Sequence, residues 1–192
     1  MKHTIRIICT SIVACTLCLI MVADAFAQQR RVVRKPKLPA CSAGASAVLA
    51  RYKVEKGEAL PATIRKSLTK KKGDAEKGLE AAVNRGKGNC LACHQIASVQ
   101  AKVDESDAET VKTYGNHGEL GPPLNGVGAR YSRGELRMIL VDPKKAFPDA
   151  DTVMPAYHTR NGLKDVSRAC QRRVMLSAQS IEDIVAFLEG LK

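Results

Sequence analysis

The strongest chemical signal in the sequence is one run of five residues, Cys90-Leu91-Ala92-Cys93-His94. A C-x-x-C-H run is typical of covalent haem attachment. Two thiols three positions apart lie on one side of a helical turn, so each can add to one vinyl group of the porphyrin. His94 follows directly, and its imidazole can reach the iron from one face. A redox dithiol or half of a zinc site would also use C-x-x-C, but neither the preceding strand nor the second ligand pair that those sites require is visible.

The iron has a second face, which an electron carrier fills with another side chain. The candidates after the motif are His117, Met138, Met154, His158 and Met175. Met138 and Met175 lie in apolar contexts that are typical of core positions. We favour Met154, because it lies in a loop where Pro155 restricts the backbone, and we keep His158 and His117 as alternatives. A thioether ligand would raise the reduction potential, whereas a second histidine would lower it.

The run Gly121-Pro122-Pro123-Leu124 is expected beside the haem, on the same side as His94. A proline carbonyl here can accept the Nδ1 proton of His94 and thereby fix the orientation of the ring. The alternative is that the prolines only stiffen a turn. Pro122 and Leu124 are the residues of this run that we predict to contact the haem.

Short helices separated by long irregular loops must position these residues. Apolar spacing and capping residues predict helices from Asp74 to about Arg85, over 97–111, over 132–141 and from Ser177 to Leu191. A weaker helical pattern covers 43–53. No run alternates cleanly enough to indicate a strand, so the predicted fold class is all-α. Loops of this length bury little of their own surface, and a large apolar cofactor would supply a core around which they pack.

The first 27 residues resemble a secretory signal peptide. Their start is basic, residues 7–22 are almost wholly apolar, and Ala25-Phe26-Ala27 places small residues where a signal peptidase cleaves. An uncleaved anchor and a lipoprotein modified at Cys15 are the alternatives. We therefore divide the chain into a signal peptide at 1–27, a basic N-terminal extension at 28–72 and a haem domain at 73–192. Export places the mature protein in the periplasm, with no membrane contact after the signal is removed.

The positive charge of the mature chain lies before the motif. Residues 28–88 hold 16 Lys or Arg against 5 Asp or Glu, a net charge of +11, whereas residues 89–192 hold 13 of each. Such a region is either a solvated extension, or a docking surface for an acidic protein, or a field that attracts anions. The export signal argues against nucleic acid as a partner.

Four cysteines remain after the first 27 residues, at Cys41, Cys90, Cys93 and Cys170. An oxidising compartment favours the pairing of thiols, so one prediction is a disulfide between Cys41 and Cys170. Such a bridge would tie the basic extension to the segment before the last helix. The other possibility is a free thiol, or one that carries sulfur covalently.

The order of these features resembles class I cytochrome c, in which short helices and long loops surround one covalent haem c. The resemblance rests on the 90–94 motif, the glycine–proline run, Met154-Pro155 and the closing helix. Within that family the chain is most similar to SoxX, the small cytochrome subunit of the sulfur-oxidation SoxAX complex. The similar segments are 67–69, 73–74, 84–85, 88–94, 121–131, 154–157 and 181–191. Before about Leu60 the resemblance is loose.

This resemblance implies that Cys90, Cys93, His94 and Met154 hold one haem c, with His94 and Met154 as the iron ligands. It also implies a heterodimer with a SoxA-type monohaem or dihaem subunit. That complex acts as an L-cysteine S-thiosulfotransferase, which joins thiosulfate to a carrier-protein cysteine and releases two electrons. This chain would pass the electrons to an acceptor cytochrome, and none of its own side chains would be catalytic.

Two other functions remain open from the sequence. A free-standing periplasmic electron shuttle would have no stable partner. A haem enzyme or a gas-binding protein would need an open coordination position on the iron.

Overall fold

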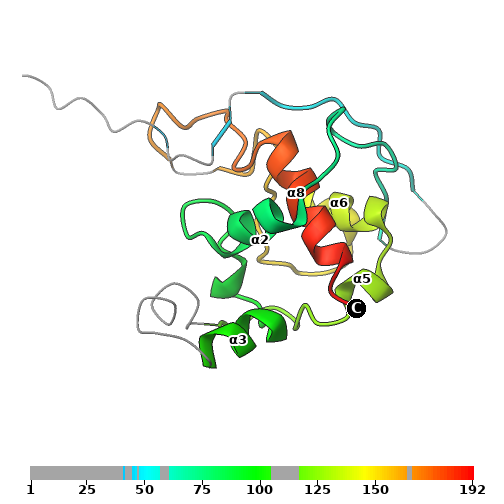
Figure 1. The fold of residues 1–192 in the computed structure, drawn as a ribbon. Helices are drawn as coiled ribbons and strands as arrows, with labels where there is room; N and C mark the ends of the chain where they lie inside the picture. The colour runs from blue at the N-terminus through cyan, green and yellow to red at the C-terminus, as the bar shows by residue number, and fades with distance from the viewer. Residues whose placement is uncertain (1–40, 42–44, 47, 57–60, 105–116, 164–165) are drawn as a thin grey trace, which may run out of the picture. The chain divides into compact units, whose positions relative to one another are not determined.

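The computed structural model describes residues 41, 45–46, 48–56, 61–104, 117–163 and 166–192 (Figure 1). Its helices, in chain order, are α2 (Ala75–Val83), the 3-10 turn η1 (Cys90–Ala92), α3 (Ala97–Asp104), α5 (Val127–Arg130), α6 (Arg133–Val141), α7 (Pro143–Ala146) and α8 (Ala178–Glu189). Within these ranges the only β-type pairings are the isolated bridges Ser46–Val174 and Glu55–Thr63. The all-α prediction is therefore confirmed.

Local signals set where the main helices begin. The Asp74 carboxylate accepts hydrogen bonds from the N–H groups of the first turn of α2. Ser132 forms a capping box with Glu135 at the start of α6. Ser177 caps α8 by accepting from the N–H of Ser180. These oxygens satisfy amide groups that have no partner within the helix, so the predicted starts at Asp74 and Ser177 are correct. The last part of the helix predicted over 97–111 lies outside the described residues.

The core forms where α8 contacts α2 and α6 (Figure 1). The apolar face of α8 is fully buried at Ile181 and Ile184, and burial of one such side chain contributes about 1.5–3 kcal/mol. At Gly78 of α2, an added Cβ would lie 2.0 Å from the carbonyl oxygen of Asp183, so only glycine allows α2 and α8 to approach this closely. Met138 is fully buried in this core and Met175 packs against it, as predicted.

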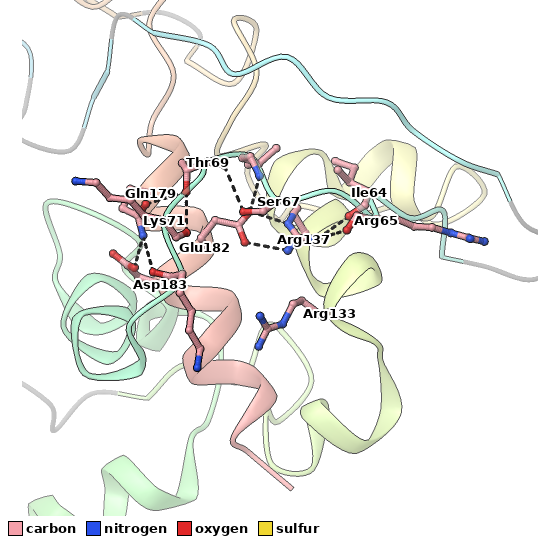
Figure 2. A network of polar contacts seen from close by, with 12 residues as sticks. Ile64, Arg65, Ser67, Thr69, Lys71, Arg133, Arg137, Gln179, Glu182 and Asp183 are labelled. Carbon is pink, nitrogen blue, oxygen red and sulfur yellow. Dashed lines mark hydrogen bonds and ion pairs between the residues drawn. The ribbon is translucent and has the colours of Figure 1, made fainter.

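Residues 61–69 run along α6 and α8 and are held there by a buried ion pair (Figure 2). Arg137 and Glu182 are 2% and 4% exposed, and the Arg137 Nε lies 2.7 Å from the Glu182 carboxylate. Arg137 also donates to the Ile64 carbonyl at 2.6 Å, and the Leu68 N–H donates to Glu182 at 2.8 Å. Burial alone would raise the pKa of Glu182, but the bonds from Arg137 and Leu68 outweigh it, so the pKa is lowered.

The helix predicted over 43–53 is wrong for the described part of that range, which is extended. The N–H and carbonyl of Ser46 pair with Val174, and the N–H of Ala50 donates to the ring of His158. These bonds use backbone groups that a helix would need, and they come from residues more than 100 positions away in the chain. No helix in the described part of the chain is long and apolar enough to cross a bilayer.

Candidate haem site

The attachment motif, residues 90–94, folds as a single tight turn. The N–H groups of Cys93 and His94 both donate to the carbonyl of Cys90, at 3.1 and 2.9 Å. Asn89 enters the turn with φ 50°, in the left-handed region that Asn tolerates better than most residues. Gly88 donates its N–H to Ala81 of α2 at 2.9 Å. The turn is thus fixed to the helix that precedes it.

The two thiols of the motif are free, whereas Cys41 and Cys170 form a disulfide. That disulfide was one of the two outcomes predicted, and it removes both residues as zinc ligands. Burial of Cys90 raises the pKa of its thiol to about 12, and the nearby Cys93 adds to the effect. A redox dithiol reacts through a thiolate, so this pKa disfavours a redox role for the pair.

Residues 117–124, the glycine–proline loop, lie along the motif. The N–H groups of Gly118, Gly121 and Leu124 donate to the carbonyls of Leu91, Cys93 and Gln95 at 2.7, 2.7 and 2.9 Å. A Cβ on Gly118 would lie 2.0 Å from the Ala92 oxygen, and one on Gly121 would lie 2.4 Å from Cε1 of His94. Both positions therefore exclude a side chain, and the backbone of Gly121 lies against the imidazole.

The His94 ring is held in one tautomer. Its Nδ1 lies 2.7 Å from the carbonyl oxygen of Pro122. A carbonyl can only accept, so Nδ1 carries the proton and donates it. Nε2 is then left with its lone pair, which is the form that binds a metal. The sequence prediction that a proline carbonyl fixes this ring is confirmed, and the residue is Pro122.

Residues 152–158, the Met154 segment, are tied to the motif by Tyr157. The Tyr157 side chain is 5% exposed, and its hydroxyl donates to the Gly88 carbonyl at 2.7 Å. Burial raises the pKa of this phenol, and the sulfurs of Cys90 and Cys93 contribute further. Met154 itself is half-buried and packs against the main core. The Met154 segment and the attachment motif therefore belong to one site.

The two alternative histidines differ in how many of their ring nitrogens are engaged. His158 is fully buried, with Nδ1 2.8 Å from the Leu176 carbonyl and Nε2 accepting from the Ala50 N–H at 3.0 Å. Neither ring nitrogen has a free lone pair, which disfavours His158 as an iron ligand. His117 accepts from the Ile96 N–H at 3.3 Å through Nδ1, and its Nε2 is buried with no hydrogen-bond partner in the described part of the chain. Met154 as the second iron ligand therefore stays a prediction, with His117 as its alternative.

The donor set fits a haem with two thioether links. Two free thiols and an imidazole with an available Nε2 lie on one turn, and Met154 comes from a segment bonded to that turn. Leu124 lies between the two apolar clusters of the core and packs against both. Sequence reasoning missed two contributors, Gly118 and Tyr157. The glycine-rich loop and a tyrosine three residues after Met154 were the available signals.

Comparison with known proteins identifies the fold and the family. The cytochrome c family model matches residues 75–192. A chain in the crystal structure of SoxXA from P. pantotrophus is 31% identical, with a TM-score of 0.55, over 68% of this chain and 90% of that one. A search of curated protein sequences gave no significant match. The chain belongs to the cytochrome c family, as a SoxX-type class I cytochrome c with covalently bound haem c.

Proposed function

We propose that this chain is the electron-transfer subunit of a periplasmic SoxAX-type complex that oxidises thiosulfate. The observation that carries the proposal is the 31% identity to a chain of SoxXA, spread over 90% of that chain. A shared haem motif alone would match many cytochromes, whereas this similarity covers 68% of this chain. The partner is then a SoxA-type cytochrome subunit.

The residues that hold the haem in this proposal are Cys90, Cys93, His94 and Met154. The two cysteines would form the thioether links, and the imidazole Nε2 and the Met154 sulfur would be the two iron ligands. The Pro122 carbonyl keeps the proton on Nδ1 of His94, which orients the ring and increases its basicity as a ligand. Leu124 supplies apolar contact and limits access of water.

The bound haem supplies a one-electron iron couple, and the protein sets its potential. The chemistry that feeds it joins a carrier-protein thiol to thiosulfate, forming one sulfur–sulfur bond and releasing one proton and two electrons. The two electrons must leave in two successive transfers, because this chain binds one haem. No side chain of this chain is required as acid, base or nucleophile. Its residues orient the ligands, exclude water and present the site to an acceptor cytochrome.

Export agrees with this chemistry, because thioether attachment takes place outside the cytoplasm. We propose that residues 1–27 are removed as a signal peptide, that 28–72 form the basic extension, and that 73–192 form the cytochrome c domain. The Cys41–Cys170 disulfide is the state expected of two thiols in an oxidising compartment.

The test is purification of the native protein together with any subunit that co-elutes, followed by addition of thiosulfate and a carrier protein. The proposal predicts a stable heterodimer and reduction of the haem, seen in the visible spectrum, only when the partner is present. Reduction of the haem by thiosulfate in the monomer alone would contradict the proposal. So would a complex whose haem is not reduced when thiosulfate and the carrier protein are added. Carbon monoxide binding to the reduced native protein would instead favour an open coordination position.

A further inference from the structure

A cluster of cations lies beside the Met154 segment, in the half of the chain whose net charge is zero. Residues 159–173, the arginine loop, contain five Lys or Arg and one Asp. The described cations of this loop are Arg160, Arg168, Arg172 and Arg173, of which the first three are exposed and the last is half-buried. The net charge of zero over residues 89–192 therefore hides a local excess of positive charge in residues 159–173.

Two more cations follow Ala50, whose N–H donates to the ring of His158 two residues before Arg160. Ser46 pairs with Val174 at the end of the arginine loop, and Ala50 donates to His158 just before it. Arg51 and Lys53 follow Ala50 and are both exposed. Among the described residues, none of the six cations forms an ion pair, although other surface cations of the protein do.

The described parts of the arginine loop, residues 159–163 and 166–173, are held by contacts of their own. The Cys41–Cys170 disulfide closes it onto the extension. The Arg160 guanidinium donates to the Arg172 carbonyl at 3.0 Å, and Arg173 donates to the Ala169 carbonyl at 2.9 Å. Each bond uses one N–H of a guanidinium that has five, so the charge and most donors remain available. The cations are therefore presented on an ordered surface.

Arg172 also adopts a backbone conformation that disfavours arginine. Its φ is 60°, in the left-handed region where glycine is under least strain. Backbone strain of this kind is typical of functional positions, because the neighbouring contacts must hold it in place. A loop that served only to connect two elements would be more stable with glycine here. The reason for an arginine at this position therefore lies in its side chain and not in the backbone conformation.

The arginine loop packs directly on the Met154 segment. A Cβ on Gly162 would lie 2.1 Å from the carbonyl oxygen of Ala156, so the two backbones touch. A protein that binds the arginine loop is therefore placed beside the segment that carries the proposed axial ligand. Electron transfer requires the bound protein to lie close to the haem site. The positive charge acts at longer range and raises the rate at which an acidic protein encounters this surface.

We propose that Arg51, Lys53, Arg160, Arg168, Arg172 and Arg173 form a docking surface for an acidic protein that exchanges electrons with this cytochrome. The proposal deepens the proposed function, on which its redox role rests. A small anion would need donors that converge on one point, whereas these cations are spread over two exposed segments. An extended carboxylate surface matches that distribution.

The test uses the purified holoprotein and a fluorescein-labelled decaglutamate peptide as the acidic probe, followed by anisotropy at low salt. The variant Arg168→Glu/Arg172→Glu should weaken binding about tenfold, because two attractions are replaced by two repulsions. The matched control Lys66→Glu/Lys70→Glu makes the same change in net charge at exposed sites outside the cluster, and should weaken binding less than about threefold. Equal losses in the two variants would overturn the proposal, since the peptide would then respond only to net charge.

A second variant separates docking from folding. Arg172→Gly removes one cation and relieves the left-handed strain, so the melting temperature should stay the same or rise while peptide affinity falls. A lower melting temperature with unchanged affinity would refute the role of Arg172. Competition by sulfate beyond the effect of sodium chloride at equal ionic strength would indicate a small-anion site instead. Tighter binding to phosphatidylglycerol vesicles than to the peptide would indicate a membrane surface, and both results count against an acidic protein.

The same variants should then be mixed with the SoxA-type subunit. We expect the association rate to fall with rising salt for the wild type, and to lose most of that dependence in Arg168→Glu/Arg172→Glu. Absence of any complex would contradict the proposed function but leave the peptide result intact. If the two double variants bind the peptide equally well while the complex with the SoxA-type subunit forms as expected, only the docking surface is contradicted.

Discussion

Replacement of Tyr157 by Phe removes one oxygen atom from the contact that joins the Met154 segment to the attachment motif. The hydroxyl donates to the Gly88 carbonyl at 2.7 Å, and both residues are buried. Phe fills the same space, so packing is kept. The Gly88 oxygen then has lost a donor and cannot reach bulk water, a situation that costs about 1–3 kcal/mol. We expect Tyr157→Phe to lower the free energy of unfolding by that amount.

The same energy should appear in the strength of Met154 ligation. If Met154 is the iron ligand, as proposed, added imidazole would have to displace it, and movement of the Met154 segment away from the motif would break the Tyr157 bond. In Tyr157→Phe that bond is already absent, so the displacement is easier by the same 1–3 kcal/mol. This corresponds to an increase in apparent imidazole affinity of about 5- to 150-fold. The weak absorption band of methionine-ligated ferric haem would report the displacement directly.

The matched control is Tyr131→Phe, which also deletes one phenolic oxygen. Tyr131 is half-buried and contacts Phe147 edge-on at a centroid distance of 6.2 Å, a contact that Phe retains. Guanidinium unfolding and imidazole titration should both leave this variant close to wild type. Our reasoning is refuted if Tyr157→Phe loses stability but binds imidazole with unchanged affinity. In that case Tyr157 would support the fold without positioning Met154.

Three further changes test the haem site and the buried ion pair of the core. Gly121→Ala places a Cβ 2.4 Å from the His94 ring, so we expect a shifted reduction potential and a lower yield of holoprotein. An unaltered potential would show that the loop can move away from the ring. Arg137→Met leaves Glu182 buried without its cation and should cost about 3–5 kcal/mol in guanidinium unfolding, whereas Arg137→Met/Glu182→Met should cost less. Folding lowers the pKa of Glu182, so the stability that its carboxylate contributes is complete above the pKa of the unfolded chain, near 4.5, and is lost as the pH falls below it. An acid unfolding curve of the wild type that matches the curve of Arg137→Met/Glu182→Met would contradict this. Met154→Ala should abolish the methionine band and lower the potential, and an unchanged spectrum would exclude this ligand.

The parts of the site that the sequence could predict are those determined by neighbours in the chain. The attachment motif is five consecutive residues, and the caps Asp74 and Ser177 act within the first turn of their own helices. The Pro122 contact was foreseeable because the glycine–proline run is typical of a tight turn beside the motif. Each of these features depends on residue types a few positions apart, and these can be read from the sequence.

The parts that could not be predicted depend on residues far apart in the chain. Residues 45–46 and 48–56 are extended because backbone groups of Ser46 and Ala50 bond to Val174 and to the ring of His158. Helical spacing in that segment is weak, so a few distant hydrogen bonds decide its conformation. His158 was an alternative ligand in the sequence, and only the positions of Leu176 and Ala50 show that both its nitrogens are occupied. No local pattern carries that information.

The Met154 segment shows why long irregular loops can hold an axial ligand in place. Its buried polar groups need partners, and a loop cannot supply them internally. The N–H of Tyr157 donates to Leu140 at the end of α6, its carbonyl accepts from Leu176, and its hydroxyl reaches Gly88 beside the motif. Three separate regions of the chain thus fix one residue, which lies three positions from Met154. A substitution in any of these regions can therefore change the strength of Met154 ligation without touching the haem, and variants that alter the potential should be sought along these contacts as well as around the iron.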